Sequence, residues 1–181
     1  MSSQTPGRLH QTLDACLAYL DGFSELTGRL VAWLTLVMMT LTCVIVVLRY
    51  GFSIGSIALQ ESIGYLHAMV FLLAMAFTLQ RDGHVRVDIF YRQFNARRKA
   101  WVNALGSLLF LLPVCGFILI TSWDFVANSW AVKEGSPNAG GLPMVYLLKT
   151  LIPAAAVLLA LQGLAEVLRS LLTLTHEEAS S

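Results

Sequence analysis

Apolar residues in this sequence fall into four long stretches, which are separated by polar connections that carry charge. None of the stretches contains Asp, Glu, Lys or Arg: Leu30–Leu48, Ser62–Gln80, Ala100–Trp123 and Thr150–Ala165. A helix rises about 1.5 Å per residue, so about 20 apolar residues cross the hydrocarbon core of a bilayer. The first three stretches reach or approach that length, and the fourth reaches it if it starts near Met144. The pattern predicts an all-α integral membrane protein with several spans.

Polar or turn residues bound each apolar stretch and set the expected organisation of the chain. The expected transmembrane helices lie near 27–49, 59–80, 99–123 and 144–169. Together they form a membrane domain over 27–170, followed by a tail over 171–181.

The segment 1–26 precedes this domain and has a pattern of its own. Leu9, Leu13, Leu17 and Leu20 recur at helical spacing, whereas the polar residues fall on other faces. This spacing predicts an amphipathic helix that lies on the membrane surface. A bend at Gly22 would then lead into the first span. A tail whose leucines align by chance is the alternative.

Basic residues are distributed unequally between the two sides of the predicted spans. One side carries nine: Arg8, Arg29, Arg81, Arg86, Arg92, Arg97, Arg98, Lys99 and Arg169. The other side carries three: Arg49, Lys133 and Lys149. Because cytoplasmic loops are enriched in Lys and Arg, both termini and the 81–99 connection are expected to face the cytoplasm.

Composition and cysteine placement exclude several classes of protein. Hydrophobic residues make up 56% of the chain and charged residues only 13%, far from the soluble average of about 25% charged. The formal net charge of +1 gives no reason to expect nucleic-acid binding. Cys43 and Cys115 fall inside predicted spans and Cys16 on the cytoplasmic side, so no structural disulfide is expected.

Two polar residues of the second span invite a functional interpretation, because burying charge in a bilayer is costly. Glu61 is near the outer start of the helix, and His67 is about two turns deeper. They could form a proton-coupled carboxylate with a histidine relay. Glu61 could instead lie at interfacial depth, paired with Arg49 or with a partner subunit, and we favour this structural role. His67 is expected to make a hydrogen bond between helices.

The cytoplasmic connection contains the most distinctive segment, Gly83 to Asp88. His84 and Asp88 are four residues apart and could meet on a helix. Two ligands are too few for a metal site, since open zinc sites use about three protein ligands and structural sites four. We therefore predict a hydrogen-bonded structural turn built on Gly83, and no metal or other cofactor.

The longest outer connection runs over 124–143 and is rich in Gly and Pro. It contains Lys133 and Glu134 and ends at Leu142-Pro143, just before Lys149. Pro153 is within the fourth helix, and Pro113 is within the third; each should kink its helix or mark close packing. No motif typical of a catalytic site occurs, so the chain is not expected to be an enzyme.

Together these residues resemble the small membrane subunit of tripartite ATP-independent periplasmic (TRAP) transporters over about 27–170. The resemblance rests on Arg49-Tyr50 closing the first span, Glu61 opening the second, the segment Gly83-His84-Val85-Arg86-Val87-Asp88, Leu142-Pro143, and Pro153. Gln60 departs from the family, whose members often carry a second acidic residue beside the one matching Glu61.

The resemblance implies a non-catalytic subunit of a sodium-coupled secondary transporter (a symporter) in the bacterial inner membrane. A periplasmic binding protein delivers the solute, commonly an organic acid, and a large permease carries it across the membrane. The small subunit acts as a stator for the permease and helps to dock the binding protein. Membrane lipids are the remaining expected partner.

Residue roles follow as hypotheses. Arg49, Glu61, Gly83, His84, Asp88, Pro143 and Pro153 are assigned to structure and subunit contacts. Lys133, Glu134 and Lys149 are assigned to the face that meets the binding protein.

Two other functions stay open. The chain could be a self-sufficient, proton-coupled small exporter that uses Glu61 as its exchanging carboxylate. It could also anchor a respiratory enzyme in the membrane. A transmembrane haem usually needs paired axial ligands, and His67 is the one histidine in any predicted span, which disfavours a haem-binding anchor.

Overall fold

The computed structural model describes residues 8–83, 91 and 93–180, and within them every regular element is helical. The elements are α1 (Arg8–Gly51), α2 (Ile57–Gln80), α4 (Ala96–Gly106), η1 (Ser107–Leu111), α5 (Leu112–Ala131) and α6 (Val145–Ser180). Four helical segments are long and apolar enough to cross a membrane: Ala15–Gly51, Ile57–Gln80, Ala96–Ala131 and Val145–Thr175. The predicted fold class, an all-α membrane protein with four spans, is confirmed.

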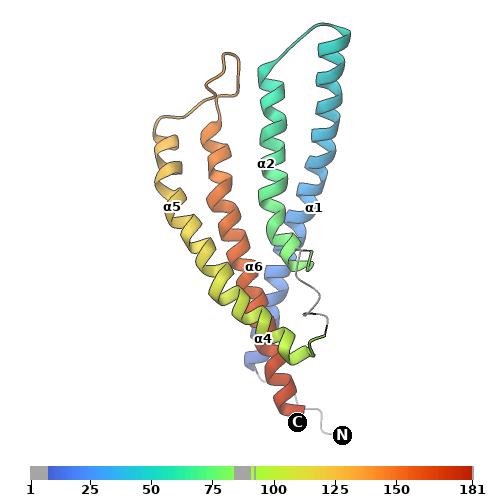
Figure 1. Ribbon diagram of the computed structural model, residues 1–181, viewed down its shortest axis with the longest axis vertical. Coiled ribbons are helices and arrows are strands. Elements are labelled where there is room, and N and C mark those ends of the chain that lie inside the picture. Colours follow the sequence, from blue (N-terminus) through green and yellow to red (C-terminus); the bar gives the residue numbers. More distant parts are fainter. Residues whose placement is uncertain (1–7, 84–90, 92, 181) are drawn as a thin grey trace.

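The helices form two antiparallel pairs that diverge from a common base (Figure 1). One pair is α1 with α2, and the other is α5 with α6. The pairs approach each other where α6 packs against α2 and the first half of α1, near the start of α1 and the end of α6. The connections 52–56 and 132–144 lie together at the opposite end. We call the end where the pairs approach each other the base, and the end that holds these two connections the outer end.

The long helices continue well beyond the apolar stretches. α1 has 44 residues and α6 has 36, so at about 1.5 Å per residue each exceeds the ~30 Å hydrocarbon core. α1 runs through Gly22 without a break in the helix. Leu17 is buried and Leu20 is half-buried, which places this part of the apolar stripe against protein. Side-chain positions for Leu9 and Leu13 lie outside the described residues.

The third span contains a single π-helical turn, η1, immediately before Pro113. Leu112 donates its backbone N–H to Ser107 O, five residues back rather than four. A proline cannot donate to the carbonyl four residues earlier, and its ring crowds that carbonyl. The wider π turn accommodates Pro113, so α4, η1 and α5 continue as one helical rod over 96–131.

Close contacts at two glycines hold neighbouring helices together. A Cβ on Gly28 of α1 would lie within 2.8 Å of Phe77 Cδ1 on α2. A Cβ on Gly163 of α6 would lie 2.6 Å from Leu111 Cδ2 of η1. Small residues let helix backbones approach, which is how helices associate in a membrane without a hydrophobic driving force.

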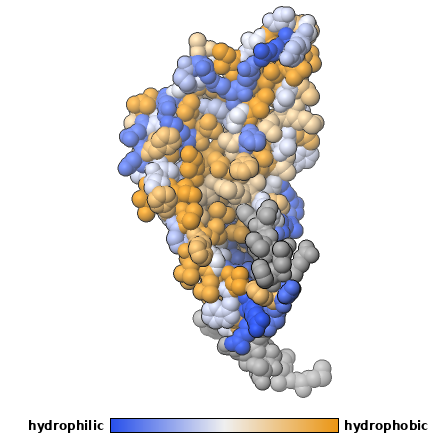
Figure 2. All heavy atoms as spheres, in the orientation of Figure 1, coloured by the Kyte–Doolittle hydropathy of each residue, from blue (hydrophilic) through white to orange (hydrophobic). Residues whose placement is uncertain are grey.

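Many large apolar side chains are exposed on the outside of the molecule. Figure 2 shows hydrophobic residues over most of the central part of one face, with hydrophilic residues gathered toward its ends. Such a surface fits the hydrocarbon core of a bilayer, where outward-facing apolar side chains contact lipid chains instead of water. The described residues therefore form a multi-pass membrane protein.

Candidate functional site

Polar side chains meet in two places, one at each end of the molecule. At the outer end, Glu61 of α2 is enclosed by the loop Gly135–Pro143. We call this contact the outer latch. The Glu61 carboxylate accepts hydrogen bonds from Ser136 Oγ, from Asn138 Nδ2 at 2.9 Å and from the backbone N–H of Leu142 at 2.7 Å. Three donors on one carboxylate fix the loop against the first turns of α2.

The loop has its own hydrogen bonds that shape it around the carboxylate. The Ser136 N–H donates to Leu142 O at 2.9 Å, and the Gly141 N–H donates to Asn138 O at 3.0 Å. Gly141 faces the carboxylate so closely that a Cβ there would lie 2.7 Å from Glu61 Oε1. Gly140 has φ of +79°, a conformation that glycine adopts without strain.

A second contact at the outer end ties α5 to α6 around Glu134. The Glu134 carboxylate accepts hydrogen bonds from Lys149 Nζ and, at 2.6 Å, from Ser129 Oγ. The hydrogen bond from Lys149 and then that from Ser129 hold the pKa of Glu134 below its ordinary value. Lys149 Nζ also lies 4.0 Å from the centre of the Phe125 ring. Glu134 and Lys149 therefore satisfy each other's charge within the chain.

Lys133 occupies the turn that ends α5 and has a different role. Its φ of 49° is in the left-handed region, and the Glu134 N–H donates to Ser129 O at 3.0 Å, closing a Schellman-type cap. Lys133 is exposed, and its Nζ lies 4.4 Å from the Trp130 ring centre and 5.0 Å from that of Tyr146. These cation–π contacts hold its ammonium at the outer surface.

The base holds the second polar cluster, which we call the base network. Asp21 of α1 and Arg169 of α6 form an ion pair, with Arg169 Nη2 at 2.9 Å from Asp21 Oδ2. Arg169 also donates to Glu166 at 2.7 Å, and Glu166 accepts from Asn103 Nδ2 of α4 at 2.9 Å. Tyr91 donates its hydroxyl to Asn103 Oδ1 at 3.0 Å. The network thus joins three helices at the narrow end of the molecule.

Further hydrogen bonds extend the base network. Gln162 of α6 is 1% exposed, accepts from Ser24 Oγ at 2.7 Å and donates to Asp21 Oδ1 at 3.3 Å. Gln80 at the end of α2 donates to the Asp21 backbone carbonyl at 3.0 Å. Each pair of helices is therefore bonded to the other by buried or half-buried polar groups.

Arg49, one of the two alternative partners that the sequence suggested for Glu61, does not meet it. No ion pair between them occurs among the described residues, and Arg49 instead lines a small hollow beside Gln60. Residues of the loop at 136–142 replace Arg49 as partners of the carboxylate. The reason is geometric. Neighbouring residues on a helix point about 100° apart, so the side chain of Glu61 faces the loop while that of Gln60 lies beside Arg49.

The predicted turn at Gly83 is present. Asp82 has φ of 56°, and the Asp82 and Gly83 N–H groups donate to Leu79 O and Thr78 O. This pairing is a Schellman cap on the end of α2. His84 and Asp88 lie outside the described residues, so their assignment stays a prediction. Within the described residues, no group of three or more His, Cys, Asp or Glu side chains is placed to hold a metal.

Two prolines assigned to structure have contrasting positions. Pro143 closes the outer loop, where its Cα would lie 3.4 Å from a Cβ on Gly135. Pro153 is inside α6, which continues through it from Val145 to Ser180.

Sequence reasoning missed most of the base network, and it missed Ser136 and Asn138 as partners of Glu61. One signal was available, because Gln162 and Asn103 are polar residues inside predicted spans.

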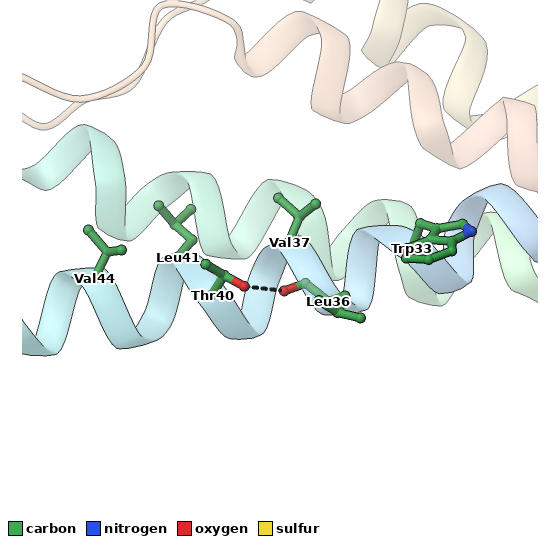
Figure 3. A pocket seen from close by; sticks show the side chains of 6 residues that line it. All are labelled: Trp33, Leu36, Val37, Thr40, Leu41 and Val44. Carbon is green, nitrogen blue, oxygen red and sulfur yellow. Dashed lines mark hydrogen bonds between the residues drawn. The ribbon is translucent and has the colours of Figure 1, made fainter.

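The exposed side of α1 carries an apolar groove of roughly 370 Å³, lined by Trp33, Leu36, Val37, Thr40, Leu41 and Val44 (Figure 3). The Thr40 hydroxyl bonds back to Leu36 O, so the groove presents an apolar surface to its surroundings.

Comparison with known protein families decides the class of this molecule. Residues 38–173 match the family model of the DctQ component of tripartite ATP-independent periplasmic transporters. The chain belongs to this family. No curated protein and no solved structure was found to match it. The DctQ component is the small membrane subunit of a TRAP transporter, a transporter subunit and not a known enzyme family, and its family implies partnership with a large permease and a binding protein.

Proposed function

We propose that this TRAP subunit is the stationary scaffold of a sodium-coupled symporter, held in the membrane while the large permease moves solute. The observation that carries this proposal is that the base network and the outer latch bond the two helix pairs to each other at both ends. A framework braced in this way resists changes in the angle between its arms. Such rigidity suits a part against which another subunit moves.

The state of Glu61 favours a structural role over proton exchange. A carboxylate that carries protons across a membrane must alternate between two environments, whereas Glu61 is bound by three donors at the outer end. Its hydrogen bonds have a clear function in fixing the loop. This observation supports the scaffold over the small proton-coupled exporter.

We propose that the outer end helps to dock the periplasmic binding protein. The loop 132–143 is supported by Glu61 beneath it and by the Glu134–Lys149 ion pair beside it. Lys133 then supplies an exposed positive charge. Glu134 and Lys149 contribute chiefly by holding the loop in shape, since each already has its partner within this chain. A pre-shaped loop loses less conformational entropy on binding than a loose one does.

Orientation follows from the charge distribution along the sequence. In the sequence, the side of the predicted spans that holds both termini has nine of the twelve Lys and Arg residues, so we place this side in the bacterial cytoplasm. The outer end then faces the periplasm, where the binding protein delivers its solute. An organic acid is the proposed class of solute. We assign Arg49, Gly83, His84, Asp88, Pro143 and Pro153 to structure and to contacts with the permease.

Affinity purification from native membranes in mild detergent tests this proposal. We expect the tagged full-length chain to recover a large multi-spanning permease in roughly stoichiometric amount, identified by mass spectrometry. Recovery of the chain alone, as a homo-oligomer that transports solute in vesicles, would contradict the scaffold and favour the exporter.

A further inference from the structure

An exposed stripe on α2 carries a polar side chain at membrane depth. Gly64, His67 and Phe71 are all exposed and follow one another at spacings of three and four residues. At about 100° per residue, these positions share one face of the helix. Ala76, the buried residue of α2, is nine positions beyond His67, which is two and a half turns. The stripe therefore faces away from the side that packs within this chain.

His67 is near the middle of this span. It is the eleventh of the 24 residues of α2, so hydrocarbon extends from it toward both surfaces of the bilayer. Its ring stacks on Phe71 with centroids 6.2 Å apart and makes no hydrogen bond with any residue that the structure describes. Neutral imidazole has one donor and one acceptor, and lipid chains offer a partner to neither.

Three exposed threonines within the spans satisfy their own hydroxyl groups. The hydroxyls of Thr40, Thr42 and Thr121 donate to the carbonyls of residues four positions back, at 2.9, 2.8 and 2.8 Å. A histidine ring has no comparable bond to its own helix. The imidazole of His67 therefore calls for a partner from outside the chain.

Gly64, one turn from His67, provides room for such a partner. A Cβ at Gly64 would meet nothing within 4 Å, so the backbone of α2 is open there. A helix that crosses at Gly64 can approach closely enough to bring its own polar group within hydrogen-bond distance of His67. Phe71, which is 67% exposed, would pack against the same helix one turn further on.

We infer that a transmembrane helix of the large permease crosses α2 at Gly64 and hydrogen-bonds to His67. This inference rests on the proposed scaffold function, because the permease is the membrane partner that the family implies. The complementary feature on the permease is a hydrogen-bond donor or acceptor at the middle of one of its spans, a group that would otherwise be unsatisfied in lipid.

Two substitutions and one matched control test the inference on the full-length tagged chain in native membranes. Gly64→Leu fills the crossing point, and His67→Leu removes the hydrogen bond. Gly116→Leu is the control, since Gly116 of α5 is also open, with nothing within 4 Å of a Cβ. The measurement is the ratio of recovered permease to this chain, alongside the chain's own yield in the membrane.

We expect each α2 variant to lower the ratio about tenfold, the effect of losing one close interhelical contact, while Gly116→Leu leaves it unchanged. If Gly64→Leu reduces the yield of the chain itself, His67→Leu, which adds no bulk, decides the outcome. An unchanged ratio in both variants, or an equal loss in the control, would overturn the inference.

A photo-crosslinking residue at position 71 identifies the occupant directly. An adduct with the permease supports the inference, whereas an adduct with a second copy of this chain, or with lipid alone, overturns it. Failure of the unmodified chain to recover any permease would instead contradict the proposed function itself. The two failures are therefore distinguishable.

Discussion

Asp21 and Arg169 are 148 positions apart in the chain, yet both carboxylate oxygens of Asp21 lie within 3.0 Å of Arg169 Nη2. The pair bonds the first helix to the last at the narrow end of the molecule. Its side chains are 31% and 39% exposed, so solvent screens part of its attraction. Its value to the fold comes from the network around it, which also includes Glu166, Asn103 and Gln162.

Asp21→Asn should loosen the base. The substitution removes the charge that faces Arg169 and weakens the bond from Gln162. We expect a loss of about 1 kcal/mol in the free energy of unfolding, the scale of a partly exposed ion pair with hydrogen bonds. Denaturant titration in detergent micelles measures this loss. Asp124→Asn, at an exposed position on α5, is the control and should change little. Equal stability of the two variants would contradict the network's role.

Glu61→Ala should release the outer loop. Ser136, Asn138 and the Leu142 N–H would lose their shared acceptor. We expect amide exchange over 136–142 to speed up by about tenfold or more, because local opening no longer breaks these bonds. Hydrogen-exchange mass spectrometry measures the rate, with the base segment near Gln162 as an internal reference. Unchanged exchange over 136–142 would show that the carboxylate does not hold the loop.

Gly141→Ala should disturb the same loop through crowding and not through loss of charge. The new Cβ would lie 2.7 Å from Glu61 Oε1 and collide with the Ser136 side chain, so the loop must shift. A destabilisation of about 1–3 kcal/mol is expected, as for overpacking at other well-packed sites. Gly55→Ala is the matched control, because a Cβ there meets nothing within 4 Å. Thermal unfolding of both variants tests this prediction, and equal unfolding midpoints would contradict the close packing of Gly141 against Glu61.

Acid should weaken the α5–α6 contact at Glu134. The pKa of this carboxyl is lowered from its ordinary value of 4.5, first by Lys149 and then by Ser129. A lowered pKa in the folded protein means that the contact is fully stabilising above the ordinary value and is lost as pH falls through the lower one. We therefore expect the carboxyl resonance of Glu134, followed by NMR, to stay constant from neutral pH down to the ordinary value.

Lys149→Met supplies the control for that titration. Without the ammonium, the main cause of the lowered pKa is gone, so the carboxyl should titrate at a higher pH than in the unmodified chain. Identical titration curves for the two proteins would mean that Lys149 does not hold the carboxylate.

The sequence was sufficient to predict the four spans, because long apolar stretches without charged residues are recognised as transmembrane helices by their hydropathy. It underestimated the helices at the base, since polar residues such as Asp21 and Arg169 ended the apolar pattern while the helix continued. Their pairing depends on how α1 and α6 cross, and local sequence carries no record of that. The same holds for the outer latch. Glu61 was noticed, yet its partners are 75–81 positions away in a loop whose fold depends on Gly140 and Gly141.

Sodium-driven uptake by the purified permease in vesicles, with and without this chain, tests the central claim most directly. The account predicts that uptake of the delivered solute requires both membrane subunits and the binding protein, and that this chain alone transports nothing. Full uptake by the permease without this chain, or solute transport by this chain alone, would contradict its role as the scaffold.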